Sequence, residues 1–323
     1  MKFALKKSVS RSGLTAAVSL AMLSVLPSVA RADALAQAIL DISVFRLTAS
    51  GSPTAGTVTG SGIVTGVFNG NPLAGINVST QNFALQTSLG VGYTPNTEYT
   101  GAVPGNFAGG STSILGVGVT NAPFNGLGAR AISDAVVSLQ PQGNGNVTST
   151  TGTTFAYEFD LASSSTVAIT FNANQFLRAF LQGTPILSGA ATASTTWQMT
   201  IAKTCINAPA GCVVPVGAVF NWSPNGQAGG ITGGTETLDP FSLNRGVTAS
   251  ANFLDEDVIA PVNGSFAAMT NQLGIGRYTM TIAQTASSRA QIEVPEPGTL
   301  ALVGLSLLGL GVVGRRRMTK AAA

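Results

Sequence analysis

The chain has 323 residues, of which 9% are charged and 45% are hydrophobic. Charged residues make up about a quarter of an ordinary soluble domain, yet this hydrophobic content excludes an intrinsically disordered chain. The formal net charge of +3 comes from the two ends, because residues 33–296 hold seven basic and thirteen acidic side chains, a net charge of −6. This mildly acidic body lacks the basic surface that nucleic-acid binding requires, so we expect no nucleic-acid partner.

The first residues have the three parts of a secretory signal peptide. Basic residues precede an apolar stretch, Leu14–Leu26, and Ala30-Arg31-Ala32 then supplies a small-x-small cleavage site. Ser28-Val29-Ala30 is a second such site. A retained anchor is the alternative, but the stretch is too short to span about 30 Å of hydrocarbon. We predict a signal helix within residues 1–32, recognised by the Sec translocon and signal peptidase, and a mature chain that starts at Asp33.

The body, residues 33–293, alternates apolar and polar residues with a period of two, which is typical of half-buried β-strands. The clearest alternating stretches are Leu40–Val44, Phe155–Leu161, Val167–Phe171, Trp197–Ile201 and Tyr278–Ile282. Groups of Gly, Asn, Ser, Thr and Pro separate these stretches and indicate turns. The pattern predicts an all-β ectodomain, an antiparallel β-sandwich or jelly roll, in preference to a Gly/Thr-rich β-helix.

Other parts of the body are less regular. Residues 34–40 and 174–182 are the two candidates for helices. Residues 50–150 are rich in Gly, Ser, Thr and Asn and poor in charge, which predicts either a second sheet with long loops or an irregular region. We expect one elaborated sandwich, with a domain boundary near residues 140–152 as the alternative.

The two cysteines, Cys205 and Cys212, lie in a loop between two predicted strands. The loop contains Asn207, Pro209 and Gly211, which favour turns. Since a secreted chain meets an oxidising compartment, we predict a disulfide that closes a hairpin loop. The alternative, a metal or redox site, would lack a histidine, a second cysteine pair and a C-x-x-C spacing.

The sequence offers no catalytic signature. It contains no histidine, which removes the commonest general base and most transition-metal sites. No G-x-S-x-G elbow or phosphate-binding loop occurs either. Glu158 and Asp160 share one face of a predicted strand and suggest a glycosidase carboxyl pair, although we favour an exposed polar face. We therefore predict a protein that is not an enzyme and needs no cofactor.

Asp255-Glu256-Asp257 is an acidic cluster. Calcium binds several oxygen ligands held close together, so a calcium site is one hypothesis for this cluster. The spacing fits no EF-hand loop, and we favour a solvated acidic turn.

Four aromatic residues also have both a functional and a structural interpretation: Trp197, Trp222, Tyr93 and Tyr99. They would serve either as a carbohydrate-binding platform or as packing residues. We favour packing because they are scattered singly along the chain.

The C-terminal tail has three parts in order. Val294-Pro295-Glu296-Pro297 precedes an uncharged run of 17 residues, Gly298–Gly314, and Arg315-Arg316-Arg317 follows at once. The run is at the lower limit for a transmembrane helix. A buried core helix is the alternative, but an all-apolar run beside an arginine cluster does not match an amphipathic surface helix. Positive charge stays on the cytoplasmic side, so residues 318–323 would be a cytoplasmic tail and the body would lie outside.

Residues 294–317 therefore resemble the PEP-CTERM sorting signal. The resemblance implies that the membrane protease-transferase exosortase cleaves an inner-membrane-anchored precursor near Pro-Glu-Pro and passes it to the cell surface or extracellular matrix. Members of this family occur in Gram-negative bacteria that make extracellular polysaccharide, and many are linked to biofilm or floc matrix. Their bodies are diverse, so the tail does not identify an activity.

These observations predict an exported structural or adhesive protein associated with exopolysaccharide or biofilm. The first alternative is a carbohydrate-binding module, with calcium assistance from the acidic cluster. The second alternative is a polysaccharide-active enzyme, against which the missing histidine and low charge weigh.

Overall fold

The computed structural model describes residues 31–50, 54–68, 71–72, 80–81, 106–115, 124–139, 144–184, 188–204, 217–250 and 254–293. Every regular element in these ranges is a β-strand, which confirms the predicted all-β body. The predicted signal helix and the predicted C-terminal transmembrane helix lie outside the described residues. Within the described ranges, no helix is long and apolar enough to cross a membrane.

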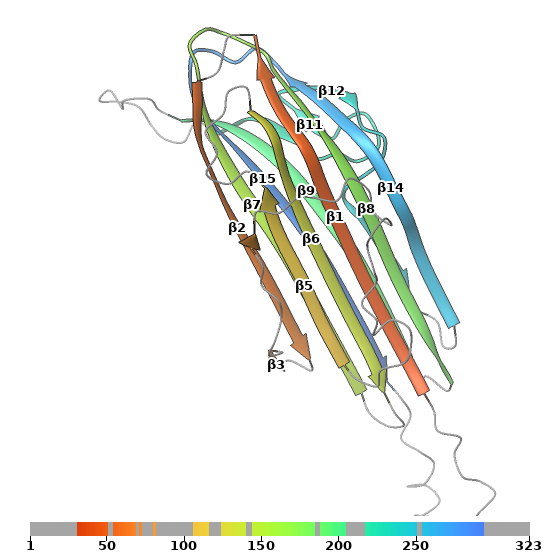
Figure 1. The fold of residues 1–323 in the computed structure, drawn as a ribbon. Helices are drawn as coiled ribbons and strands as arrows, with labels where there is room; N and C mark the ends of the chain where they lie inside the picture. The colour runs from red at the N-terminus through yellow and green to blue at the C-terminus, as the bar shows by residue number, and fades with distance from the viewer. Residues whose placement is uncertain are drawn as a thin grey trace, which may run out of the picture. The chain divides into compact units, whose positions relative to one another are not determined.

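The strands form two sheets that pack face to face (Figure 1). Sheet A contains, in spatial order, β12 (Gly234–Leu238), β14 (Leu254–Thr270), β8 (Val167–Thr184), β1 (Arg31–Ala49), β6 (Phe124–Leu139), β5 (Asn106–Leu115) and β4 (Thr80–Gln81). Sheet B contains β11 (Ile231–Thr232), β10 (Ala218–Trp222), β9 (Ser188–Thr204), β15 (Gly276–Glu293), β7 (Asn144–Leu161), β2 (Thr54–Phe68) and β3 (Asn71–Pro72), while β13 (Arg245–Ala249) also pairs with β9. The paired strands run antiparallel except for β4 and β5, which are parallel.

The first and last strands lie in the middle of the two sheets. Strand β1 pairs with β8 and β6, and β15 pairs with β9 and β7. The two central strands pack against each other, and Gln284 of β15 donates a 2.8 Å hydrogen bond to the carbonyl of Leu40 in β1. Arg31–Pro295 forms one compact unit, and residues 144–152 of the alternative boundary lie in strand β7 of this unit.

Strand β1 shows how a bulge changes a period-two pattern. Leu40 and Ile42 belong to the core, but Val44 is 43% exposed and has a φ of 51°. The register between β1 and β6 shifts between Ile42 and Phe45, so Phe45 and Leu47 take the inward positions instead. The predicted inward position of Val44 is therefore wrong, because the bulge reverses the alternation at this point.

Both predicted helices are strands. Residues 34–40 lie in β1 and residues 174–182 lie in β8, where Leu35 pairs with Phe180 and Ile39 pairs with Phe176. The prediction for residues 34–40 failed because β1 is buried on both faces here, so its sequence shows an apolar run, interrupted only by Gln37, instead of an alternation. Periodicity alone does not distinguish such a strand from a buried helix.

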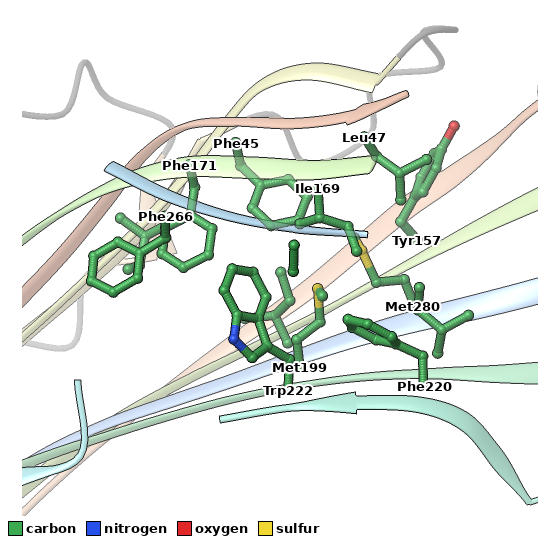
Figure 2. Close-up of a cluster of buried hydrophobic side chains, with 14 of the residues drawn as sticks. Phe45, Leu47, Tyr157, Ile169, Phe171, Met199, Phe220, Trp222, Phe266 and Met280 are labelled. Atoms are coloured by element: carbon green, nitrogen blue, oxygen red, sulfur yellow. The ribbon is translucent and has the colours of Figure 1, made fainter. Parts of the chain in front are cut away.

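Aromatic side chains from both sheets fill one part of the interior (Figure 2). Phe171 of sheet A lies 4.8 Å from Trp197 and 5.4 Å from Trp222 of sheet B, measured between ring centroids. Phe266, on the neighbouring strand β14, stacks on Phe171 with the ring centroids 5.0 Å apart. Full burial of one large apolar side chain stabilises a fold by about 1.5–3 kcal/mol, so this cluster holds the two sheets together.

Small and polar side chains fill the other part of the interior. A Cβ on Gly62 of β2 would lie 2.3 Å from Oγ1 of Thr112, and a Cβ on Gly110 of β5 would lie 2.3 Å from Oγ1 of Thr151. Only glycine permits so close an approach of the two sheets. The described strands of the Gly/Ser/Thr-rich region thus belong to both sheets and form a tight contact between them.

Hydroxyl groups bridge the sheets in this polar part. Ser133 of β6 donates a 2.8 Å hydrogen bond to the carbonyl of Ser149 in β7, and Ser288 of β15 donates a 2.7 Å bond to the carbonyl of Ser133. All three serines are buried. Buried polar groups are stable only when they are hydrogen-bonded, so these bridges make a polar interior compatible with folding.

Candidate functional site

The outer face of sheet B carries a broad array of hydroxyl groups, which we call the hydroxyl face. On β7, β15 and β9 the inward positions hold the buried core residues, so the residues between them point outward. About half of these outward residues are threonine or serine, and none of those is buried. The hydroxyl face consists of Thr59, Ser61 and Thr65 of β2, Thr148, Thr150 and Thr154 of β7, Thr279, Thr281, Thr285 and Ser287 of β15, and Thr192, Ser194, Thr196 and Thr200 of β9.

The strand register brings these residues into rows across the sheet. One row runs from Thr65 through Thr150 and Ser287 to Ser194, with one hydroxyl on each of the four strands. Within it, Thr65 donates a 3.3 Å hydrogen bond to the carbonyl of Thr150, and the hydroxyls of Thr150 and Ser287 lie 3.3 Å apart. Neighbouring strands are about 4.8 Å apart, so the rows present closely and regularly spaced hydroxyl groups.

Charged residues flank the hydroxyl face at two ends. Arg277 binds Asp160 with two hydrogen bonds of 2.8 and 2.9 Å at one end. Arg289 donates to Asn146 and Gln291 at the other end. Between these ends, Glu158 of β7, opposite Thr279, is the one charged residue among the described outward positions. Such a surface offers donors, acceptors and methyl groups to a ligand and carries little charge.

Glu158 and Asp160 do share the outer face of β7, as the sequence suggests. The Arg277 guanidinium lowers the pKa of Asp160, mainly through their hydrogen bonds. A glycosidase acid needs the opposite shift, because it must hold a proton at neutral pH. Glu158 is exposed.

The acidic cluster lies in β14. Asp257 is exposed, and one of its carboxylate oxygens accepts a 3.1 Å hydrogen bond from the backbone N–H of Thr248. The side chains of Asp255 and Glu256 lie outside the described part of the chain. Among the side chains that the structure does describe, no three acidic or cysteine residues are grouped as a metal site.

The two tryptophans belong to the core, as we favoured. Trp197 and Trp222 are each 0% exposed, and their rings meet edge to face at 5.7 Å. The indole N–H of Trp222 donates a 2.7 Å hydrogen bond to Glu236. Neither tryptophan is available to stack on a sugar, and Tyr93 and Tyr99 lie outside the described residues.

Sequence reasoning missed a buried ion pair on the outer side of sheet A. Arg130 of β6 binds Asp41 of β1 with two hydrogen bonds, one of them 2.7 Å between Nη2 and Oδ2. The Asp41 side chain is fully buried. Burial raises the pKa of Asp41, and the hydrogen bond and charge of Arg130 oppose this rise. The partners are 89 residues apart, so no local pattern indicates the pair.

The predicted processing residues and the two cysteines of the predicted disulfide fall largely outside the described ranges. Ala30, Cys205, Cys212, Val294, Pro295, Glu296, Pro297, Arg315, Arg316 and Arg317 are all in this group. Ala32 lies in β1, opposite Leu139 and Gly183. The predicted cleavage after Ala32 would therefore remove the first two residues of β1, whereas cleavage after Ala30 would leave this strand whole.

Comparison with known proteins identifies the tail. The family model of the PEP-CTERM protein-sorting motif matches residues 293–317. No curated protein and no solved structure matches the chain significantly. The match implies an exported, membrane-anchored precursor that exosortase processes. The chain thus carries a PEP-CTERM sorting motif as its C-terminal tail.

Proposed function

We propose that this chain is a structural or adhesive protein of the cell surface or extracellular matrix, and that the hydroxyl face binds exopolysaccharide. In this proposal the protein performs no catalytic step and needs no resident cofactor. The observation that carries the proposal is the array of exposed threonine and serine side chains across β2, β7, β15 and β9.

The chemistry of this face suits a polymer of sugars. Each hydroxyl both donates and accepts a hydrogen bond, as sugar hydroxyls do, and each threonine adds a methyl group that contacts the apolar side of a sugar ring. A single such hydrogen bond contributes only about 0.5–1.5 kcal/mol. Binding would therefore depend on many weak contacts along an extended chain, which the rows of the hydroxyl face provide.

The strand boundaries agree with processing at the C-terminal end. Strand β15 ends at Glu293, and the sorting motif begins at residue 293. The compact unit Arg31–Pro295 contains every strand of both sheets. Removal of the chain beyond Pro-Glu-Pro would therefore leave both sheets complete in the released protein.

Loss of hydroxyl groups from the face should weaken binding to the polysaccharide of the producing cell. We expect the triple variant Thr150→Ala, Thr154→Ala and Thr196→Ala to bind about tenfold more weakly, since three lost hydrogen bonds of about 0.5 kcal/mol each amount to that factor. All three side chains are exposed, so the fold should be unaffected. Co-sedimentation with the purified polysaccharide measures the change.

The matched control replaces three exposed polar residues on the outer face of sheet A: Thr170→Ala, Asn172→Ala and Ser265→Ala. This variant should bind like the wild type. Equal losses in the two triple variants would contradict a specific role for the hydroxyl face. Repeating the measurement with a chelator tests the calcium hypothesis for Asp255, Glu256 and Asp257, which predicts weaker binding when calcium is removed.

Replacement of Glu296 by alanine should block processing of the tail, because Glu296 is the acidic residue of the matched motif. We expect the variant to accumulate at least tenfold more uncleaved precursor than the wild type in cells that contain exosortase. Mass spectrometry of both chain ends measures this. A Gln291→Ala variant is the control, since Gln291 precedes the matched residues 293–317 and should not affect cleavage. Equal processing of wild type and Glu296→Ala with and without exosortase would contradict the sorting role.

A further inference from the structure

The sequence contains five Asn-Gly pairs, and one of them, Asn225-Gly226, lies in the loop between β10 and β11. Asn125-Gly126, Asn144-Gly145 and Asn263-Gly264 lie in strands β6, β7 and β14. Asn69-Gly70 lies outside the described residues. In an Asn-Gly pair the backbone nitrogen of the glycine has open access to the asparagine side chain, because glycine carries no side chain of its own. The environment of each pair therefore decides whether the two groups react.

The carboxylate of Asp239 binds the backbone of the Asn225-Gly226 loop. Its Oδ2 accepts a 3.0 Å hydrogen bond from the N–H of Asn225 and a 2.9 Å hydrogen bond from the N–H of Gly226. Burial raises the pKa of Asp239, and these two N–H groups oppose the rise. A carboxylate that already accepts the proton of the Gly226 nitrogen is placed as a general base for that nitrogen.

The side chain of Asn225 is held in place as well. The backbone N–H of Gln227 donates a 2.8 Å hydrogen bond to Oδ1 of Asn225, which folds the side chain over the peptide that joins Asn225 to Gly226. A donor on this oxygen stabilises the negative charge that develops when a nucleophile adds to the carbonyl carbon. Asn225 is exposed, so water reaches it.

The fold requires glycine at residue 226 and fixes the loop around it. Gly226 has a φ of 74°, and a Cβ there would lie 2.9 Å from the backbone nitrogen of Ser242. The N–H of Leu243, which is fully buried, donates a 3.2 Å hydrogen bond to the carbonyl of Pro224. The base, the nitrogen and the carbonyl group are therefore oriented before any reaction.

We infer that Asn225 is a self-modification site, at which the chain converts this asparagine into aspartate or isoaspartate through a cyclic imide. Asp239 takes the proton of the Gly226 nitrogen, and this nitrogen attacks Cγ of Asn225. The N–Cγ bond forms, the Cγ–Nδ2 bond breaks, and Nδ2 leaves as ammonia with the proton that Asp239 had taken. Water then opens the imide at either of its two carbonyl groups. Each chain reacts once, so the step is not enzymatic turnover.

Asn263-Gly264 shows why exposure is not sufficient. Asn263 is also exposed, but it lies in β14 opposite Asn174 of β8. The side chain of a strand residue stands perpendicular to the sheet, away from the backbone nitrogen of the next residue. The same dipeptide in this strand therefore lacks the approach that the loop provides.

The modification changes the loop that carries it. The product adds a negative charge at residue 225, beside the carboxylate of Asp239, and like charges at this distance repel. Isoaspartate also lengthens the main chain by one carbon, which disturbs the bridge between residue 225 and Ser242. We therefore expect the loop to loosen as a molecule ages.

Peptide mapping by mass spectrometry tests the inference on the processed protein, incubated folded at neutral pH. Asn225 should lose ammonia at least tenfold faster than Asn263, which is a small share of what a positioned general base contributes. In water labelled with heavy oxygen, the product at residue 225 should carry the label.

Two variants test the role of Asp239. Asp239→Asn keeps an oxygen that accepts the two N–H groups but is not a base, so it should slow the reaction of Asn225 at least tenfold. Asp257→Asn is the matched control, because Asp257 also accepts a backbone N–H, that of Thr248. It lies near the start of β14, whereas Asp239 follows β12, which pairs with the end of β14. This control should react at the rate of the wild type.

Denaturation separates the contribution of the fold from that of the dipeptide and needs no variant. In urea, Asn225 and Asn263 should react at similar rates, and Asn225 should react more slowly than in the folded protein. A folded wild type in which Asn225 reacts no faster than Asn263, or no faster than in urea, would overturn the inference. An unchanged rate in folded Asp239→Asn would overturn it as well.

Discussion

Arg130→Met is expected to lower the free energy of unfolding by about 3–5 kcal/mol at neutral pH. The substitution removes the cation that binds the fully buried carboxylate of Asp41. Methionine fills much of the same volume, so the loss reflects mainly an uncompensated buried charge. Urea denaturation followed by far-UV circular dichroism measures the change.

The loss should depend on pH in a defined direction. Burial already raises the pKa of Asp41, and removal of Arg130 eliminates the two influences that oppose this rise. The pKa of Asp41 in the folded variant therefore lies above its value of about 3.9 in the unfolded chain. A carboxyl group with a raised folded pKa stabilises the fold in its protonated form, and this contribution is lost as pH rises through the folded pKa. The variant should thus approach the stability of the wild type below about pH 4 and diverge from it at higher pH.

Two controls make this prediction specific. Arg277→Met breaks the ion pair with Asp160 on the surface, where the arginine side chain is 44% exposed, and solvent screening should leave only a small effect. The double variant Asp41→Leu, Arg130→Met should recover most of the loss, because it removes both charges. If Arg130→Met were no more harmful than Arg277→Met and independent of pH, the buried pair would not contribute as described.

Trp197→Ala is expected to destabilise the sandwich by about 3–5 kcal/mol. Trp197 is 0% exposed and lies between Phe171 of the opposite sheet and Trp222 of its own sheet. Alanine would leave a cavity where aromatic rings from both sheets meet, and a rigid two-sheet core collapses poorly into such a space. The midpoint of urea denaturation measures the loss.

Thr196→Ala serves as the control for the adjacent position. Thr196 is exposed on the outer face of the same strand, so its removal should change the free energy of unfolding by less than about 0.5 kcal/mol. Similar losses at residues 196 and 197 would contradict the assignment of inner and outer faces in β9.

Local patterns in the sequence were sufficient for the features that depend on neighbouring residues. Phe155–Leu161 and Trp197–Ile201 alternate because one face of each strand is buried and the other meets solvent. The PEP-CTERM motif is recognisable because its three parts are contiguous at the end of the chain. The threonines of the hydroxyl face also repeat at every second position, as in Thr192–Thr196, and this period was the local signal for an exposed polar face.

Only the tertiary structure decided the features that join distant segments. The bulge between Ile42 and Phe45 appears only in the pairing of β1 with β6, and the burial of both faces of β1 made residues 34–40 resemble a helix. The Asp41–Arg130 pair and the rows of hydroxyls arise from strand register, which brings together residues that lie far apart along the chain. The sequence by itself thus determined the strand character of the body and the sorting tail, because a strand's period and a contiguous signal are local. The arrangement of the strands, and with it the alignment of hydroxyls into rows and the Asp41–Arg130 pair, required long-range pairing that no local pattern encodes.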